Sequence, residues 1–252
     1  MRIRASVAAV GGALALTALA VPAAQADGAD GDVRITKVVV DGDNKVSVGT
    51  SGAVTVKVSV TATDDSGIAG ADMFDLYGPA DGFAMTGKPV CAKVDATTST
   101  CTASVKIDPR TDYLSDASAG TWYVSAWIDA KDGNYVWKEK AAAFSFQRTS
   151  KLTADAAPEP VKKGRTLTVT GKLTRADWET LKYGGYGSRS VQLQFRKKTA
   201  GAYTTLKTVK ADARGNLKTT TTASVDGYYR FVFAGNSTAS AVNAAGDLVD
   251  VR

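Results

Sequence analysis

Aspartate is the residue type whose number and spacing in this chain favour a particular chemistry. The 252-residue sequence contains 22 aspartates but only three glutamates, and it has no histidine. The absence of histidine excludes Ser/His/Asp and Cys/His nucleophilic machinery as well as zinc sites of the HExxH type. Grouped carboxylates still suit calcium, which takes six to eight oxygen ligands in a flexible geometry. We therefore expect oxygen-based cation binding rather than nucleophilic catalysis.

Two aspartate-rich turns contain the candidate ligands. If the flanking segments are strands of one β-sandwich, the two turns emerge at the same end of it. The predicted calcium ligands are Asp64, Asp65, Asp129, Asp132 and Asn134. Tight turns also use Asp and Asn for their own hydrogen bonds, so turns without an ion are the alternative interpretation. Two further clusters resemble fragments of a calcium loop but do not complete the EF-hand pattern with a terminal glutamate: Asp27, Asp30 and Asp32, which lie where we expect a frayed amino terminus, and Asp41, Asp43 and Asn44.

Strands that alternate apolar and polar residues must position these turns. Alternation runs from Val54 to Ala62 and again from Leu167 to Leu173, as is typical of antiparallel strands with one solvated face. Each half also contains a glycine followed two residues later by an aromatic residue, Trp122 or Tyr229, which we expect to be structural core residues. The glycine-rich segment 177–190 is predicted as a loop. The pattern predicts an all-β fold of two tandem Ig-like antiparallel β-sandwich domains.

Composition divides the chain into three parts. Residues 1–26 place two arginines before an apolar run from Val7 to Val21 and end in small residues, which predicts a cleaved signal peptide. Residues 27–148 contain 12 Lys/Arg and 17 Asp/Glu, a net charge of −5. Residues 149–252 contain 17 and 8, a net charge of +9. We predict an acidic sandwich over 27–148 and a basic sandwich over 149–252.

The two cysteines, Cys91 and Cys101, fit an exported protein. The polar segment between them predicts two strands joined by a turn, and we expect a disulfide across that hairpin. Neither CxxC spacing nor histidine accompanies the pair, so a redox or metal-binding role is not expected.

Several segments resemble the repeated strands and turns of bacterial extracellular Ig-like domains. They include GTSGAVTVKVSVTATDDSGI, GTWYVSAWIDAKDGNY and GRTLTVTGKLTRADW. They are especially similar to small secreted proteins of high-GC Gram-positive bacteria, and the resemblance covers nearly the whole mature chain. It implies the fold and an extracellular location. Some members of this group are labelled calcium-binding, which implies the same ion for this chain.

Together these observations predict a secreted, non-enzymatic binding or structural module of the cell envelope or extracellular space. Calcium is the expected cofactor, and no catalytic residue is predicted. The expected partners are a cell-wall polymer, a carbohydrate or an extracellular protein, but not nucleic acid. We also expect a monomer without a membrane span in the mature chain.

Two alternatives remain open. One is a carbohydrate-active or wall-modifying enzyme that uses a pair of carboxylates. The other is a secreted inhibitor or adhesion protein. A stripe of outward aromatic residues, Tyr123, Trp127, Tyr135 and Trp137, would either stack on sugar rings or cover the neighbouring domain.

Overall fold

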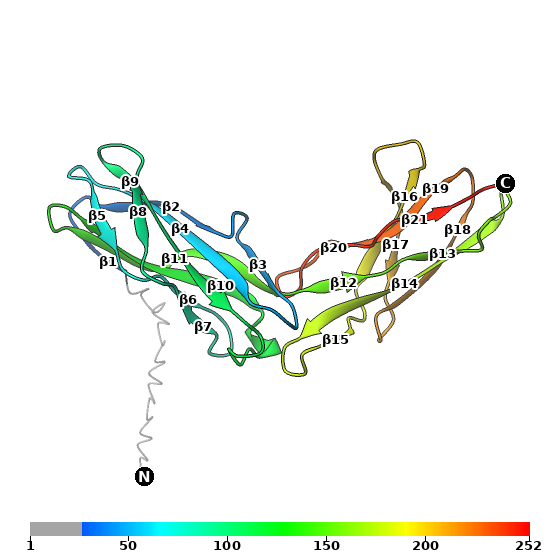
Figure 1. Ribbon diagram of the computed structural model, residues 1–252, viewed down its shortest axis with the longest axis horizontal. Helices are drawn as coiled ribbons and strands as arrows, with labels where there is room; N and C mark the ends of the chain where they lie inside the picture. Colours follow the sequence, from blue (N-terminus) through cyan, green and yellow to red (C-terminus); the bar gives the residue numbers. More distant parts are fainter. Residues whose placement is uncertain (1–26) are drawn as a thin grey trace, which may run out of the picture.

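Two β-sandwiches lie side by side in this protein (Figure 1). The computed structural model describes residues 27–252, so the predicted signal peptide lies outside the described residues. The strands pair in antiparallel fashion apart from β3 and β11, which run parallel. The all-β fold of two sandwiches, predicted from the period-two alternation, is confirmed. Within residues 27–252, no helix is long and apolar enough to cross a membrane.

The first sandwich consists of a seven-stranded and a four-stranded sheet. The larger sheet contains β1 (Asp27–Asp30), β3 (Lys45–Val48), β5 (Ile68–Ala71), β6 (Asp75–Tyr77), β7 (Phe83–Met85), β10 (Gly120–Ala130) and β11 (Tyr135–Arg148). The smaller sheet contains β2 (Arg34–Val40), β4 (Val54–Thr63), β8 (Val90–Lys93) and β9 (Thr98–Ile107). A single 3₁₀ turn, η1 (Asp116–Ser118), precedes β10.

The second sandwich consists of two five-stranded sheets. One contains β12 (Ser150–Leu152), β13 (Asp155–Ala157), β14 (Thr166–Asp177), β15 (Lys182–Gly185) and β18 (Asn216–Thr222). The other contains β16 (Ser190–Lys197), β17 (Thr204–Lys210), β19 (Gly227–Phe233), β20 (Val242–Asn243) and β21 (Asp247–Val249). The segment 177–190 is therefore not only a loop, because β15 pairs back onto the end of β14.

Alternation along the long strands places one residue in two inside each sandwich. Trp122 is 1 % exposed in the first core, and its Nε1 donates a hydrogen bond to the carbonyl of Ser118 at 2.7 Å. Tyr229 is 2 % exposed in the second core, beside the fully buried Phe231. Removing such large apolar surfaces from water is the main force that holds each pair of sheets together.

The hairpin disulfide joins two neighbouring strands of the first sandwich. Cys91 on β8 lies directly opposite Cys101 on β9, and the two residues form a disulfide. Closing this short loop restricts the unfolded chain, which is how such a bond stabilises a fold.

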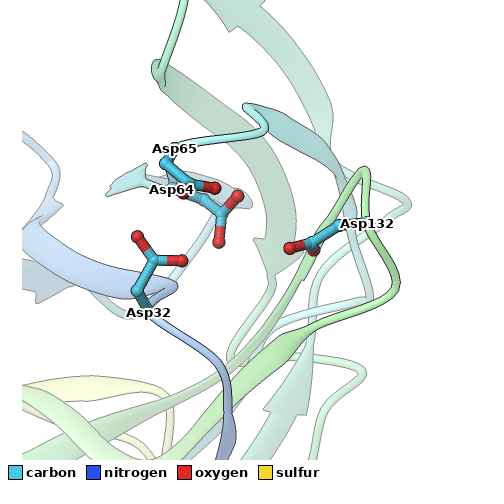
Figure 2. A group of neighbouring side chains, drawn as sticks. All are labelled: Asp32, Asp64, Asp65 and Asp132. Atoms are coloured by element: carbon cyan, nitrogen blue, oxygen red, sulfur yellow. The ribbon is translucent and has the colours of Figure 1, made fainter.

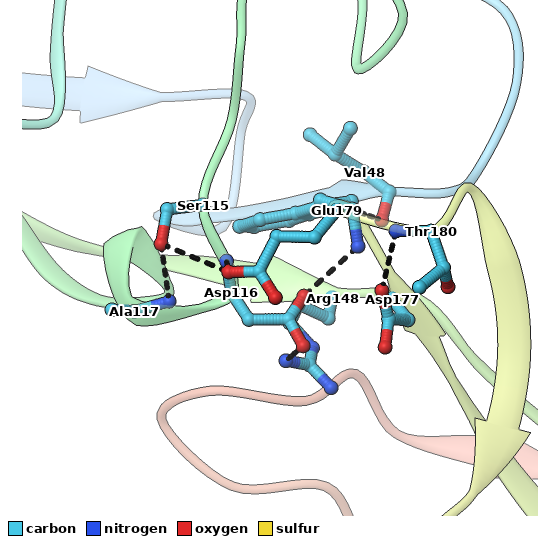
Figure 3. Close-up of polar contacts among 9 residues, drawn as sticks. Val48, Ser115, Asp116, Ala117, Arg148, Asp177, Glu179 and Thr180 are labelled. Atoms are coloured by element: carbon cyan, nitrogen blue, oxygen red, sulfur yellow. Dashed lines mark hydrogen bonds and ion pairs between the residues drawn. The ribbon is translucent and has the colours of Figure 1, made fainter.

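A tryptophan from the second half of the sequence packs into the first core. Trp178 follows β14, yet it is buried with the apolar residues of the first sandwich, its ring centroid 5.3 Å from that of Phe146. Its Nε1 donates to the carbonyl of Val48 at 3.2 Å, and its backbone N–H donates to Asp116 at 2.9 Å (Figure 3). This insertion joins the two sandwiches through a packed contact.

Candidate metal centre

Four aspartates from three separate turns converge at one end of the first sandwich. Asp32 lies between β1 and β2, Asp64 and Asp65 lie between β4 and β5, and Asp132 lies between β10 and β11. Each contributes one carboxylate oxygen to a group in which all four oxygens lie within 4.8 Å of one another. Figure 2 shows the Asp64 carboxylate between those of Asp32 and Asp132.

Asp64 is the buried centre of this cluster. The residue is only 2 % exposed, and its backbone N–H donates to the carbonyl of Thr97 at 3.0 Å. Its Oδ1 accepts hydrogen bonds from the backbone N–H of Ser66 at 2.9 Å and from the Ser66 hydroxyl at 2.5 Å. Its Oδ2 is buried without a hydrogen-bond partner. Because a buried, unpartnered carboxylate oxygen is costly, a cation at this position would stabilise the site.

Ser66 and the backbone hold the turns in place around Asp64. The Ser66 hydroxyl accepts a hydrogen bond from the backbone N–H of Asp132 at 3.2 Å, and Lys131 donates its N–H to the carbonyl of Gly67 at 2.9 Å. The β4–β5 turn and the β10–β11 turn are thus tied together by groups that need no ion. These hydrogen bonds therefore fix the turns that contain the acidic side chains before any ion binds.

The carboxylates perturb one another's protonation. The hydroxyl of Ser66 is the main group that lowers the pKa of Asp64 below its ordinary value. Loss of hydration, followed by repulsion from Asp64 and Asp65, raises the pKa of Asp32. Among residues 27–252, no lysine or arginine forms an ion pair with any of the four aspartates. The cluster therefore concentrates negative charge that the protein itself does not neutralise.

The donor set matches the requirements of calcium. Four aspartate carboxylates supply hard oxygen ligands, and calcium accepts such ligands in one-oxygen or two-oxygen binding modes at irregular geometry. An open cavity of about 320 Å³ reaches the cluster, and its lining includes Asp32, Asp64, Asp65 and Arg34. This opening leaves room for water as further ligands. Magnesium fits less well because it demands a near-ideal octahedron.

The structure brings together only part of the ligand set predicted from the sequence. Asp64, Asp65 and Asp132 lie in the cluster, whereas Asp129 lies outside it and accepts a hydrogen bond from Trp127 Nε1 at 2.8 Å. Asn134 contacts the cluster through Asp132. Its Nδ2 donates a hydrogen bond to the Asp132 carboxylate at 2.7 Å and so orients that group.

Asp32 joins this cluster although it was not among the ligands predicted from the sequence. Its position depends on the neighbouring Gly31. Gly31 has a φ of +71°, and a Cβ at this position would overlap the side chain of Asn134. Glycine is therefore required for the β1–β2 turn to lie against the β10–β11 turn, and this contact places Asp32 beside Asp64.

A second acidic group, at the joint between the sandwiches, has a different character. Asp116, Asp177 and Glu179 lie close together, but each of them already accepts a hydrogen bond or ion pair from a protein donor through at least one oxygen (Figure 3). Asp116 forms an ion pair with Arg148, a residue that is only 6 % exposed. Glu179 accepts from Ser115, and Asp177 accepts from the N–H of Thr180 at 2.7 Å. We assign this group to interdomain contact rather than to an ion.

The aromatic stripe lies on the outer face of the first sandwich. Trp127 of β10 stacks on Tyr135 of β11 with the ring centroids 4.6 Å apart, and the ring centroid of Trp137, also on β11, lies 6.5 Å from that of Trp127. Tyr123 packs separately against Tyr77 at 5.7 Å. The four rings are all partly exposed, and the stacking of Trp127 on Tyr135 covers one face of each of these two rings.

Comparisons with known proteins give similarity at the level of fold. No protein-family model matches the chain, and no curated protein matches its sequence. A DUF4785 family protein from Legionella pneumophila is similar in structure with 13 % identity and a TM-score of 0.40, over 77 % of this chain and 51 % of that one. This chain therefore spans about half the length of the Legionella protein.

The three N-terminal domains of the Highly Immunogenic Outer Capsid protein (Hoc) of bacteriophage RB49 are also similar. The identity is 10 % and the TM-score is 0.32, over 87 % of this chain and 70 % of that one. Both similarities are distant. The resemblance to secreted proteins of high-GC Gram-positive bacteria stays a prediction.

Proposed function

We propose that this chain is a secreted, non-enzymatic module of two Ig-like sandwiches that binds calcium at the loop end of the first sandwich. The observation that carries the proposal is the buried Asp64 Oδ2, which has no hydrogen-bond partner although its carboxylate is grouped with three others. Calcium would be held by Asp32, Asp64, Asp65 and Asp132. It would offset their mutual repulsion and fasten the β1–β2 turn to the two other turns.

Secretion is supported by the apolar amino-terminal run and by the disulfide, a bond that persists in oxidising compartments. A non-enzymatic role is supported by the complete absence of histidine. In such a module calcium acts as a structural ligand that rigidifies one end of the sandwich, where an extracellular partner would bind.

Thermal unfolding in chelator and in millimolar calcium tests the proposal. The purified chain, with its export signal removed, should unfold at a higher temperature in calcium. At a calcium concentration 100 times the Kd, ligand binding adds about 2.7 kcal/mol to the free energy of unfolding. Isothermal titration calorimetry should give one calcium ion bound per chain.

The variant Asp64→Asn should abolish both effects while preserving the fold, because its side-chain oxygen still accepts the Ser66 hydrogen bonds. Asp81→Asn is the matched control, since Asp81 is an exposed residue of the same sandwich outside the cluster, with a φ of +57° that asparagine tolerates. An unchanged melting temperature of the parent chain in calcium, or equal binding by Asp64→Asn, would refute the proposal.

A further inference from the structure

Three neighbouring strands in one sheet of the second sandwich contain basic residues without acidic ones; the only acidic residue in the strands of this sheet is Asp247 on β21. Strands β16, β17 and β19 contain no Asp or Glu but five basic residues, Arg196, Lys197, Lys207, Lys210 and Arg230. The surrounding segment, residues 149–252, has a net charge of +9. A surface of one sign attracts ligands of the other sign and raises their rate of encounter. The charge of this sheet therefore favours an anionic partner.

The two arginines lie next to each other on the outer face of this sheet. Val191 and Leu193 of β16 and Tyr229 and Phe231 of β19 are buried, so residues of the opposite parity face outward. The outward positions of the two strands pair directly, with Gln194 opposite Arg230 and Arg196 opposite Tyr228. We call these four residues, together with Tyr203, the arginine–tyrosine face.

Neighbouring side chains hold both guanidinium groups in fixed positions. Arg230 donates from Nε and Nη2 to Gln194 Oε1 at 3.0 and 2.9 Å, and its guanidinium lies 3.8 Å from the ring centroid of Tyr203. Arg196 lies 4.3 Å over Tyr228 and donates from Nη1 to the carbonyl of Ala200 at 2.7 Å. Side chains ordered before binding lose less entropy when a ligand arrives.

Tyr203 crosses the face because residue 246 is a glycine. A Cβ at Gly246 would overlap the hydroxyl of Tyr203 and contact Tyr228. The ring of Tyr203 therefore extends from the β16–β17 connection toward the start of β21 and covers Arg230 on the way. The arrangement spans three strands and their connections rather than one turn.

Neither arginine of this face forms an ion pair with any carboxylate of residues 27–252. Elsewhere in the chain, Arg148 and Arg110 do pair with aspartates. A rigid guanidinium with N–H groups left over is suited to bind a carboxylate through two parallel hydrogen bonds.

We propose that the arginine–tyrosine face binds an acidic polysaccharide through the carboxylates of its sugar units. Arg196 and Arg230 would bind two carboxylates along the polymer, while Gln192 and Thr205 beside them offer amide and hydroxyl groups to sugar hydroxyls. Nucleic acid is less well matched, since single-strand binding needs free aromatic faces and these tyrosine rings already have guanidinium groups against them. This site is independent of the proposed calcium site, which lies in the other sandwich.

Binding of defined galacturonate oligomers tests this inference. Calorimetric titrations in chelator keep the result separate from the calcium proposal, because galacturonate itself binds calcium. The parent chain should bind the oligomer, and it should bind the methyl-esterified oligomer at least about tenfold more weakly because the ester has lost the carboxylate charge. Absence of binding by the parent chain at low salt would overturn the inference, as would equal affinity for the two oligomers.

Two double variants with the same loss of charge locate the site. R196A/R230A should weaken binding at least about tenfold. K172A/K218A removes two exposed cations from the other sheet of the same sandwich and should change the affinity less than twofold. Equal losses in the two variants would mean general electrostatic attraction and would overturn the assigned site.

A conservative variant guards against loss of folding. R196K/R230K keeps both charges but lacks the planar fork, so it should bind several-fold more weakly while unfolding near the parent's melting temperature. Full affinity in R196K/R230K would contradict the role of the guanidinium groups. Tighter binding of a single-stranded DNA oligomer than of galacturonate, with the same dependence on Arg196 and Arg230, would overturn the ligand class.

Discussion

Asp64 combines two features that seldom occur together in one aspartate. One oxygen is satisfied by Ser66, while the other is buried and unpartnered among three further carboxylates. The first feature fixes the position of the side chain. The second leaves the charge of a buried carboxylate oxygen uncompensated, so a cation would stabilise it. Calcium affinity should therefore depend on the spatial cluster rather than on how close the aspartates are in sequence.

The contrast between Asp132 and Asp129 tests this dependence on position. Asp132→Asn should weaken calcium binding at least about tenfold, because it removes one unit of charge next to the ion. Asp129→Asn should leave the affinity unchanged, since Asp129 lies outside the cluster and its role as acceptor for Trp127 survives in asparagine. Calorimetric titration measures both. A larger loss in Asp129→Asn than in Asp132→Asn would show that the ion is bound elsewhere.

Asp32 should make the proposed calcium binding sensitive to acid. Its pKa is raised above the ordinary value of 3.8, so it takes up a proton at a higher pH than a free aspartate. A protonated carboxyl is a poor calcium ligand, so affinity should be constant near neutral pH and fall as the pH approaches this raised pKa. Without calcium, the pH dependence concerns the stability of the fold and has the opposite sign. The free energy of unfolding should fall as the pH rises through that pKa, because ionisation of Asp32 destabilises the folded state.

Calorimetric titrations over a pH series check this prediction, with Asp32→Asn as the comparison. The variant should bind more weakly at neutral pH, and its affinity should begin to fall only at a lower pH. A calcium affinity of the parent chain that is constant down to pH 3.8 would contradict it.

Strands and turns differ in how far they can be predicted from the sequence. Period-two alternation is a local signal, and it correctly indicated β4, β10, β14 and β19 as core strands. The hairpin of Cys91 and Cys101 was predictable for the same reason. β15 was missed because its glycines have no apolar alternation, and it is defined only by pairing with β14.

The candidate site shows the same limit. Asp64, Asp65 and Asp132 were predictable because their turns follow clear strands. Asp32 was not, because β1 has no buried residue and its place depends on pairing with β11. Asp129 was included because it is close to Asp132 in sequence, but its side chain lies outside the cluster and accepts a hydrogen bond from Trp127. Which residues of different turns come together depends on three-dimensional contacts, and no local sequence pattern encodes these contacts.

Gly31 tests whether the β1–β2 turn must lie against its neighbour. Gly31→Ala should lower the free energy of unfolding by more than 1 kcal/mol, because alanine is strained at a φ of +71° and its Cβ overlaps Asn134. It should also weaken calcium binding by displacing Asp32. Gly42→Ala is the control, since Gly42 has a φ of +85° but no heavy atom within 4 Å of the added Cβ. Chemical denaturation should show a larger loss of stability for Gly31→Ala than for Gly42→Ala, and calcium titration should show weaker binding by Gly31→Ala. Equal calcium affinities of the two variants would contradict the account.

At the scale of the whole molecule, Trp178 packs the two sandwiches together, and we expect them to unfold as one cooperative unit. It comes from the second half of the sequence but is buried with Phe146 in the first core. Asp116, which accepts a hydrogen bond from the Trp178 backbone N–H, forms an ion pair with Arg148. Burial lowers the pKa of Arg148, although the nearby Asp116 opposes that shift. The joint therefore combines apolar packing with a buried charge pair that would be costly to separate.

Trp178→Ala should uncouple the sandwiches. Loss of a buried tryptophan costs about 3–5 kcal/mol, and the single calorimetric unfolding transition expected of the parent chain should separate into two. Trp127→Ala is the matched control, because it removes an indole from the outer face and should leave one transition. Two transitions in the parent chain, or one in Trp178→Ala, would contradict the prediction that Trp178 couples the unfolding of the two sandwiches.

The arrangement as a whole places the proposed cation site and the proposed anion site on different sandwiches with a packed joint between them. The central claim remains the calcium site, and a crystal structure of the chain grown in calcium tests it most directly. The account predicts one ion bound by oxygens of Asp32, Asp64, Asp65 and Asp132 at about 2.3–2.6 Å. A structure at saturating calcium with no ion among these four side chains, or with the ion at Asp116, Asp177 and Glu179 instead, would contradict it.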